Sequence, residues 1–418
     1  MNKILPGYLL PFSVSTGKNY LLLFLIWPFL AFITAIANYS RKEAKMVVYI
    51  FLIYYGLTFV LYSTGIDAYR YALNLGRTAE LPFSDFYKIV GGLYTETTVD
   101  IVSPLVTFIV SRFTTNHGVL FAIWTAIFGY FYLKSISLLH DRYRLMPGWS
   151  ALIVMIFFIM VIPVTTIGGV RMPVATWMFF YGAYHVVLNR DYRYLFIAMA
   201  SSLVHWSFLS ANAVLLIYFF AGNRNIVYIP IVILSFILPQ LLAPVFESIA
   251  MEVGGPLQRR YEGYSSEGYI LGMEESRAQA SWFLPLSNIL VFNYLILLII
   301  VIKFIYGNLM NGKYERNLFS FLLLFISLVN FGKVIPTFGG RFQTVFYLFA
   351  SLYAFLYFLK MPGNRIHFLA LIGIVPIALY IAIEFRIGSG TINSWIFSPG
   401  FGSPLLISGL SLADLFFN

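Results

Sequence analysis

The residues of this sequence best suited to chemistry stand in two short strings, each placed between long apolar runs. Gly168-Gly169-Val170-Arg171 is the first, and Phe338-Gly339-Gly340-Arg341 is the second. A glycine pair lets backbone approach a ligand, and an arginine at the start of the next helix adds a bidentate cationic fork to the helix dipole. Both strings predict an anion site for phosphate or diphosphate, with Arg171 and Arg341 as ligands. Arginines that snorkel to lipid headgroups are the structural alternative.

Two further groups supply candidate acids and bases. His205 lies in the polar segment 201–207, which interrupts a long apolar stretch. A histidine titrates near neutral pH and so serves as a general acid or base. Asp67 is a second candidate base for a sugar hydroxyl, and Arg70 is a third candidate anion ligand. The structural alternatives are a histidine that hydrogen-bonds between helices and a local Asp67–Arg70 pair that caps a helix.

Aromatic and polar residues alternate in the segment 258–269, which includes Arg260, Tyr261 and Tyr264. Flat aromatic rings stack on the C–H faces of sugars, while neighbouring polar groups bind hydroxyls. This composition predicts a glycan-binding loop. A solvated loop is the alternative, because many of the 30 tyrosines belong to the aromatic belts of a membrane protein.

The composition is that of an integral membrane protein. Of the 418 residues 60% are hydrophobic and only 11% are charged, whereas soluble domains are about 25% charged. Apolar runs of roughly 17 to 25 residues recur along the chain, which is the length a helix needs to cross a bilayer. The chain has no cysteine, which excludes disulfides and thiolate catalysis. It also contains no Walker P-loop, HExxH or GxSxG string and no metal-ligand spacing, so we predict no metal and no cofactor.

The predicted fold class is an all-α polytopic membrane protein with about 12 transmembrane helices, within a range of roughly 11–14. It forms a single transmembrane domain over residues 1–418. Three polar regions are expected on the external face: a loop or surface helix at 64–117, a loop at 249–282 and a C-terminal tail at 386–418. The predicted spans lie near 20–38, 46–63, 118–139, 148–167, 172–189, 194–206, 208–221, 226–248, 283–305, 317–336, 342–360 and 366–385.

The distribution of Lys and Arg predicts the orientation. If 41–45 is cytoplasmic, alternation places the other short basic loops there too, with about half of the 27 basic residues and few of the 17 acidic ones. Both Gly-Gly-Arg strings and His205 then face outward. This topology requires 101–117 to lie along the surface or re-enter, and 194–221 to form a hairpin bent near His205. In the alternative, 101–117 crosses and 194–221 is one helix. The net charge of +10 is then a loop effect and predicts no nucleic-acid partner.

In this arrangement the sequence resembles the bacterial Wzy-type polysaccharide polymerases, and among them the EpsG-like group. The resemblance covers about residues 20–385. It is carried by an Asp-x-x-Arg-Tyr cluster after the second span, an external arginine that opens a span, a histidine in a polar break, a tyrosine-rich loop and a late Arg-Phe pair. Arg171 also begins an Arg-x10-Gly pattern, which Arg341 lacks. The residues are Asp67, Arg70, Tyr71, Arg171, Gly182, His205, Tyr261, Tyr264, Arg341 and Phe342.

The resemblance implies a GT-C-like fold and metal-independent, inverting glycosyl transfer. Lipid-linked oligosaccharide repeat units would be joined on undecaprenyl diphosphate at the periplasmic or external face of the bacterial inner membrane, in O-antigen, capsule or exopolysaccharide synthesis. The partners are then the lipid-linked donor and acceptor, membrane lipids and, in some systems, a chain-length regulator. In this reading Arg171, Arg341 and Arg70 bind the diphosphate, and His205 or Asp67 is the base.

Three other functions stay open from the sequence. An O-antigen ligase uses the same donor with a different acceptor. A transporter or flippase for lipid-linked oligosaccharide is a non-enzymatic alternative, although its polar groups are expected along a path across the membrane rather than at one face. Membrane-bound acyl transfer would leave the paired arginines unexplained.

Overall fold

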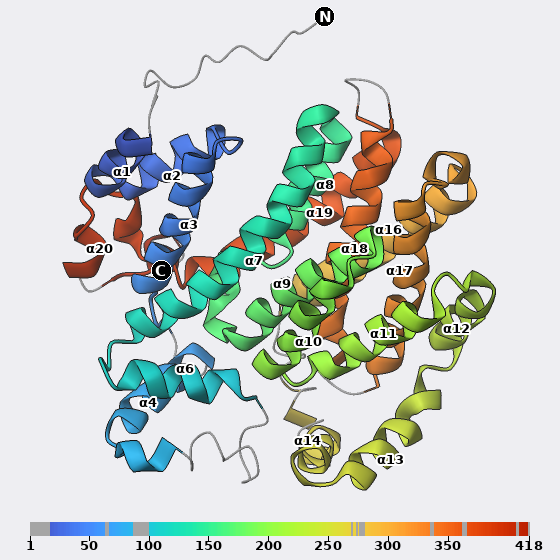
Figure 1. Ribbon diagram of the computed structural model, residues 1–418, viewed down its shortest axis with the longest axis horizontal. Helices are drawn as coiled ribbons and strands as arrows, with labels where there is room; N and C mark the ends of the chain where they lie inside the picture. The colour runs from blue at the N-terminus through green and yellow to red at the C-terminus, as the bar shows by residue number, and fades with distance from the viewer. Residues whose placement is uncertain are drawn as a thin grey trace, which may run out of the picture.

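The computed structural model describes residues 17–62, 67–86, 100–268, 271–272, 275, 281–334, 338–361, 366–406 and 409–416. Within these residues the chain is helical, and the only β-pairing is an isolated bridge between Asn393 and Ser411. Figure 1 shows helices of very different lengths packed into one bundle. The predicted all-helical fold is therefore confirmed.

Six helices in the described part of the chain are long and apolar enough to cross a membrane, which makes this a multi-pass membrane protein. The crossing count of about 12 and the GT-C-like likeness stay predictions, because the other predicted spans form shorter helices. The six are α7 (His117–Leu145), α8 (Trp149–Met160) with its 3-10 extension η3 (Val164–Gly169), α16 (Phe283–Phe304), α17 (Lys313–Gly332), α18 (Phe338–Leu359) and α19 (Phe368–Ser389). The shorter helices are α1 (Gly17–Ile26), α2 (Pro28–Ala37), α3 (Lys42–Leu57), α9 (Arg171–Tyr184), α10 (Leu195–Val204), α11 (Phe208–Ala221) and α12 (Asn225–Ile237).

The predicted span 20–38 is not one continuous helix. Trp27 leaves the helical conformation, and Pro28 starts α2 at a position where its missing N–H is tolerated. The result is two helices of 10 residues, each about 15 Å long and so about half the thickness of the hydrocarbon core. Hydropathy does not report such a break, and the signal for it in the sequence is Pro28.

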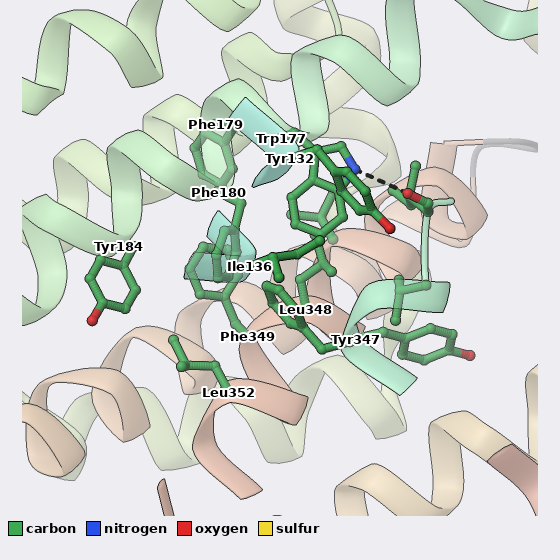
Figure 2. Packing of buried hydrophobic residues seen from close by; sticks show 14 of the residues in the cluster. Tyr132, Ile136, Trp177, Phe179, Phe180, Tyr184, Tyr347, Leu348, Phe349 and Leu352 are labelled. Atoms are coloured by element: carbon green, nitrogen blue, oxygen red, sulfur yellow. Dashed lines mark hydrogen bonds between the residues drawn. The ribbon is translucent and has the colours of Figure 1, made fainter. Parts of the chain in front are cut away.

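Helix α18 is the centre of the bundle. Every residue from Val345 to Phe358 is buried, as expected of a helix that is apolar all round. Figure 2 shows its aromatic and aliphatic side chains packed against those of α7 and α9, with Phe180 against Phe349 at a centroid distance of 4.9 Å. Because α18 begins with the second Gly-Gly-Arg string, the core fixes where Arg341 stands.

Helices α10 and α11 form the predicted hairpin. The helix ends at Val204 and resumes at Phe208, with His205 in extended conformation between them. The two outer ends meet again, since Arg190 before α10 donates to the Tyr218 hydroxyl near the end of α11 at 3.3 Å. His205 is therefore at the apex of the hairpin.

The two long polar excursions contain helices. In the first, the amphipathic α4 (Asp67–Ala79) packs on α6 (Val102–Ser111), which at 10 residues is too short to cross a bilayer. Arg112 joins them by donating to the carbonyls of Thr78 and Leu81. The second excursion, predicted as a loop, forms α13 (Ala243–Val253) and α14 (Gly255–Ser265).

The predicted C-terminal tail packs back on the N-terminal helices. Helix α19 continues to Ser389, and the chain then forms η8 (Ser394–Phe397), α20 (Ser403–Leu406) and α21 (Leu412–Phe416). The Thr391 and Tyr55 hydroxyls are 2.6 Å apart, and Trp27 Nε1 donates to the Phe397 carbonyl at 2.8 Å. The break at Trp27 thus receives its hydrogen-bond partner from the tail.

Gly182 lets α9 and α10 approach closely, and its substitution tests that packing. A Cβ on Gly182 would lie 2.5 Å from the Ala198 backbone nitrogen, so we expect Gly182→Val to destabilise the fold by about 1–3 kcal/mol through overpacking. Gly148→Ala is the matched control, because a Cβ there meets no atom within 4 Å. Thermal unfolding of the purified protein in detergent measures both. Equal midpoints would contradict the close contact of α9 and α10.

Candidate functional site

A single buried carboxylate, that of Asp100, joins three distant parts of the chain. Its side chain is 1% exposed. Oδ1 accepts the backbone N–H of Trp206 at 2.7 Å and lies 3.5 Å from Nδ1 of His205. Oδ2 forms an ion pair with Nη1 of Arg171. Residues 100, 171 and 205 are thereby held at one point, which we call the Asp100 cluster.

Tyr71 completes the Asp100 cluster from helix α4. Its hydroxyl accepts a hydrogen bond from Nε of Arg171 at 2.6 Å, and the guanidinium carbon of Arg171 is 5.7 Å from the centre of the tyrosine ring. Two sides of the guanidinium are therefore occupied by Asp100 and Tyr71. The Arg171 side chain is still 26% exposed, so part of the cation reaches the surface.

The first glycine of each Gly-Gly-Arg string serves packing. A Cβ on Gly168 would be 3.2 Å from the Phe59 ring and 3.6 Å from Cβ of Ala68 on α4, and a Cβ on Gly339 would be 2.8 Å from Cα of Lys333. Gly340 has open space around it. The expectation that a glycine pair opens the backbone to a headgroup therefore does not hold for Gly168 and Gly339. The tight contact of Gly168 is with the Phe59 ring, whereas its distance to Ala68 of α4 is that of an ordinary contact.

Arg341 also lies near His205. The ring of its neighbour Phe342 packs on Phe208, three residues after the histidine, at a centroid distance of 5.5 Å. The positive charge of Arg341 is close enough to lower the pKa of His205. Among the residues that the structure describes, the Arg341 guanidinium makes no hydrogen bond or ion pair. Its N–H groups are therefore available to a ligand.

The electrostatics of the Asp100 cluster set the protonation states of its members. Burial alone would raise the pKa of the Asp100 carboxyl, but the hydrogen bond from His205, the charge of Arg171 and the Trp206 N–H outweigh it and hold that pKa well below its ordinary value. Burial lowers the pKa of His205, and the charges of Arg171 and Arg341 lower it further against the opposing effect of Asp100. The cluster at pH 7 is an ionised Asp100, a cationic Arg171 and a neutral His205.

Comparison with known proteins shows the family of this chain. The EpsG family model matches residues 62–396, most of the chain and every member of the Asp100 cluster. The chain belongs to the EpsG family. Neither the search of characterised proteins nor the search of solved structures gives a match. This EpsG-family chain is thus a multi-pass membrane protein related to polysaccharide biosynthesis.

The structure brings together three of the predicted site residues of the EpsG-family chain, namely Arg171, His205 and Arg341. Asp67 and Arg70 instead pair with each other on α4, where their side chains are 44% and 70% exposed. This geometry favours the local pair over a base and an anion ligand. Tyr71, next in the chain, provides the contact from α4 to the cluster.

The predicted glycan-binding residues lie on helix α14 of the EpsG-family chain. Tyr261 is near Glu247 of α13, whose charge acts with partial burial to raise the pKa of the phenol. The side chains of Arg260 and Tyr264 fall outside the described part of the structure. Their glycan contacts stay a prediction.

Asp100 is the member of the candidate site that sequence reasoning missed. It is the last acidic residue before the helix at 117–145 and is flanked by Val99 and Ile101, at the start of an apolar segment. A charge in such a setting has to find a partner. That signal singles out the residue, but its partners are 71 and 105 residues further along the chain.

A double-mutant cycle tests the ion pair of Asp100 and Arg171. Removal of one partner of a buried pair costs about 3–5 kcal/mol, because the other charge is left without compensation. We expect Asp100→Asn and Arg171→Gln each to lower the midpoint of thermal unfolding, and the double variant to regain part of the loss. Asp67→Asn with Arg70→Gln is the control cycle, since an exposed pair contributes about 0–1 kcal/mol. Strict additivity at Asp100 and Arg171 would contradict their coupling.

Proposed function

We propose that this protein is a glycosyltransferase that polymerises oligosaccharide repeat units carried on undecaprenyl diphosphate. A hydroxyl of the lipid-linked acceptor unit attacks the anomeric carbon of the growing chain. The bond between that carbon and the diphosphate oxygen breaks, and undecaprenyl diphosphate leaves. The observation that carries the proposal is a neutral, oriented histidine near two arginines, with family membership as independent support.

His205 is the base in this mechanism. Its Nδ1–H faces the Asp100 carboxylate, which fixes the tautomer and leaves the Nε2 lone pair to accept the proton of the attacking hydroxyl. Its lowered pKa keeps the ring neutral at pH 7. As the hydroxyl proton moves to Nε2, the carboxylate stabilises the imidazolium that forms, as the aspartate does in a Ser-His-Asp triad. Asp100 is thus a positioning residue.

The two arginines have different roles with the leaving diphosphate. Arg171 shares its charge with Asp100 and Tyr71, so only its remaining N–H groups are available to a ligand. Arg341 has no side-chain partner in the described structure and is the main cation that balances the charge of the leaving diphosphate. Preorganised cationic donors at the departing oxygens stabilise the transition state by several kcal/mol in a site of low dielectric constant.

The proposed location is the external face of the bacterial cytoplasmic membrane. Helix α9 runs from Arg171 in the Asp100 cluster to a π-helical turn, His185–Asn189, followed by Arg190. The short basic loops therefore lie at the opposite end of the same helices from the cluster. The positive-inside rule supports an outward-facing site.

Reconstitution tests the proposal. The purified protein in liposomes, supplied with undecaprenyl-diphosphate-linked repeat units, is expected to give a ladder of products on a gel, each longer by one unit. Transfer of a single unit to a different lipid acceptor, with no ladder, would indicate an O-antigen ligase. Movement of intact substrate across the bilayer without new glycosidic bonds would indicate a transporter, and either result would overturn the polymerase.

Substitution of Arg341 and His205 tests their roles. We expect Arg341→Ala to lower the rate of elongation by about 100-fold or more, as for the loss of one preorganised donor, and Arg341→Lys to restore part of it. His205→Gln should lower the rate with little effect on substrate affinity, because it removes proton transfer and keeps a polar side chain. Arg77→Ala is the matched control, since Arg77 is an exposed arginine of α4. Normal chains from Arg341→Ala would return that residue to a lipid-snorkelling role.

The pH dependence of elongation tests the partnership of Asp100 with His205. Activity requires the unprotonated ring, so the rate should fall as pH drops through a pKa below the ordinary histidine value of about 6.5. Asp100→Asn removes the anion that favours the imidazolium, so the acid limb should move to still lower pH while the plateau rate falls. Asp67→Asn should leave the limb in place. If the acid limb of the pH–rate profile stays in place or moves to higher pH in Asp100→Asn, Asp100 is not the partner of the catalytic histidine.

A further inference from the structure

A groove lined entirely by apolar side chains lies between α12 and α16, over α17 and α18. Its volume is about 280 Å³. The lining includes Ile233 of α12, Ile300 of α16, Leu323 and Ile326 of α17 and Phe346 of α18. Ile233 and Ile300, on the two walls, are 54% and 47% exposed. Because these helices belong to the membrane domain, the groove is open to lipid.

A cation, the ammonium of Lys333, lies close to the groove lining. Nζ of Lys333 is 4.1 Å from the centre of the Phe292 ring, and Phe292 packs on Phe346 of the groove lining at 5.6 Å. The ammonium donates to Oδ1 of Asn330 at 3.1 Å. No carboxylate pairs with it in the described residues. This lysine is not used by the mechanism above.

The same junction carries Arg341. Gly339 packs directly against the backbone of Lys333, and Arg341 follows two residues later. Contacts therefore lead from Phe346 of the groove lining through Phe292 to Lys333, and from Lys333 to the first turn of α18, which carries Arg341. Two cations near an apolar groove suit an amphiphile whose headgroup carries at least two negative charges. An ordinary phospholipid offers a single phosphate, so charge complementarity favours a diphosphate lipid.

We propose that the groove between α12 and α16 binds the isoprenoid chain of a polyprenyl-diphosphate-linked substrate, with Lys333 bound to its diphosphate beside Arg341. This inference rests on the proposed function and adds to it a lipid-binding groove and a third cationic ligand. It also assigns a role to the exposed apolar walls of α12 and α16, which no other part of the described chain covers.

Photolabelling of the full-length protein in nanodiscs tests the groove. The probe is a polyprenyl diphosphate with a diazirine near the middle of its chain. We expect label on α12 and α16 that unlabelled undecaprenyl diphosphate displaces, while an equal amount of phosphatidylglycerol does not. Equal displacement by phosphatidylglycerol would make the groove an ordinary lipid site and overturn the proposal, as would label confined to other helices.

Variants locate the two ends of the lipid. Ile300→Trp fills the groove, so about tenfold more probe should be needed for the same labelling. Leu297→Trp is the matched control, because Leu297 is 50% exposed on the same helix and does not line the groove. Lys333→Gln should weaken labelling by the diphosphate probe several-fold, and Lys333→Arg should retain it. Unchanged labelling in both Ile300→Trp and Lys333→Gln, with circular dichroism that shows folded protein, would overturn the proposal.

The labelling readout does not depend on polymerisation. If the wild type makes a ladder but its label is not displaced by undecaprenyl diphosphate, the groove assignment fails alone. If displacement is specific but authentic substrate gives no ladder, the polymerase reading fails, and the protein is a polyprenyl-diphosphate-binding protein with another activity.

Discussion

The buried charge of Asp100 is the constraint on which the rest of the site depends. An isolated carboxylate in an apolar interior is too costly to persist, so its oxygens must find cationic and N–H partners. Here the partners are the Arg171 guanidinium, the His205 ring and the Trp206 N–H. They come from the start of α9 and from the apex of the α10–α11 hairpin. The need of one buried carboxylate for partners thus fixes the relative positions of segments that are far apart in the chain.

The same constraint distinguishes two arginines whose sequence settings are nearly identical. Each follows a Gly-Gly pair and opens a helix, but only Arg171 has an acidic partner in the described structure. The Arg171 guanidinium binds the Asp100 carboxylate and the Tyr71 hydroxyl. Asp100 in turn faces the His205 ring. Arg341 retains its charge for a ligand. Repetition of a string therefore does not imply repetition of a role, because the local field depends on what tertiary contact brings nearby.

The sequence predicts the parts of this structure that depend on one helix at a time. Apolar run length places α16 to α19 within a few residues of their observed bounds, and the polar break at His205 predicts the hairpin. Hydropathy does not mark the break at Trp27, since both sides of it are apolar, and Pro28 is the residue whose type indicates it. The role of Asp100 could not be predicted for a different reason. It depends on contacts with residues 171 and 205, and the periodicity of a single sequence carries no information on such contacts. The glycines of each Gly-Gly-Arg string are visible in the sequence, but packing against Ala68 or Lys333 is not.

The proposed polymerisation on lipid carriers has two opposing requirements, and different parts of the fold suit each of them. Stabilisation of a leaving diphosphate needs donors that do not reorganise, and both arginines lie in the first turn of helices of the central core, α9 and α18. Exchange of a long apolar chain with the bilayer needs helices with exposed faces. Helix α12 fits that need: it packs on the bundle chiefly through α17, has Pro230 in its middle and exposes much of its apolar surface. The junction of α17 and α18, where Gly339 meets Lys333, is where the rigid and the exchangeable parts join. In the proposed mechanism, entry of the lipid chain and formation of the glycosidic bond therefore meet at this junction, whose position is fixed by core packing.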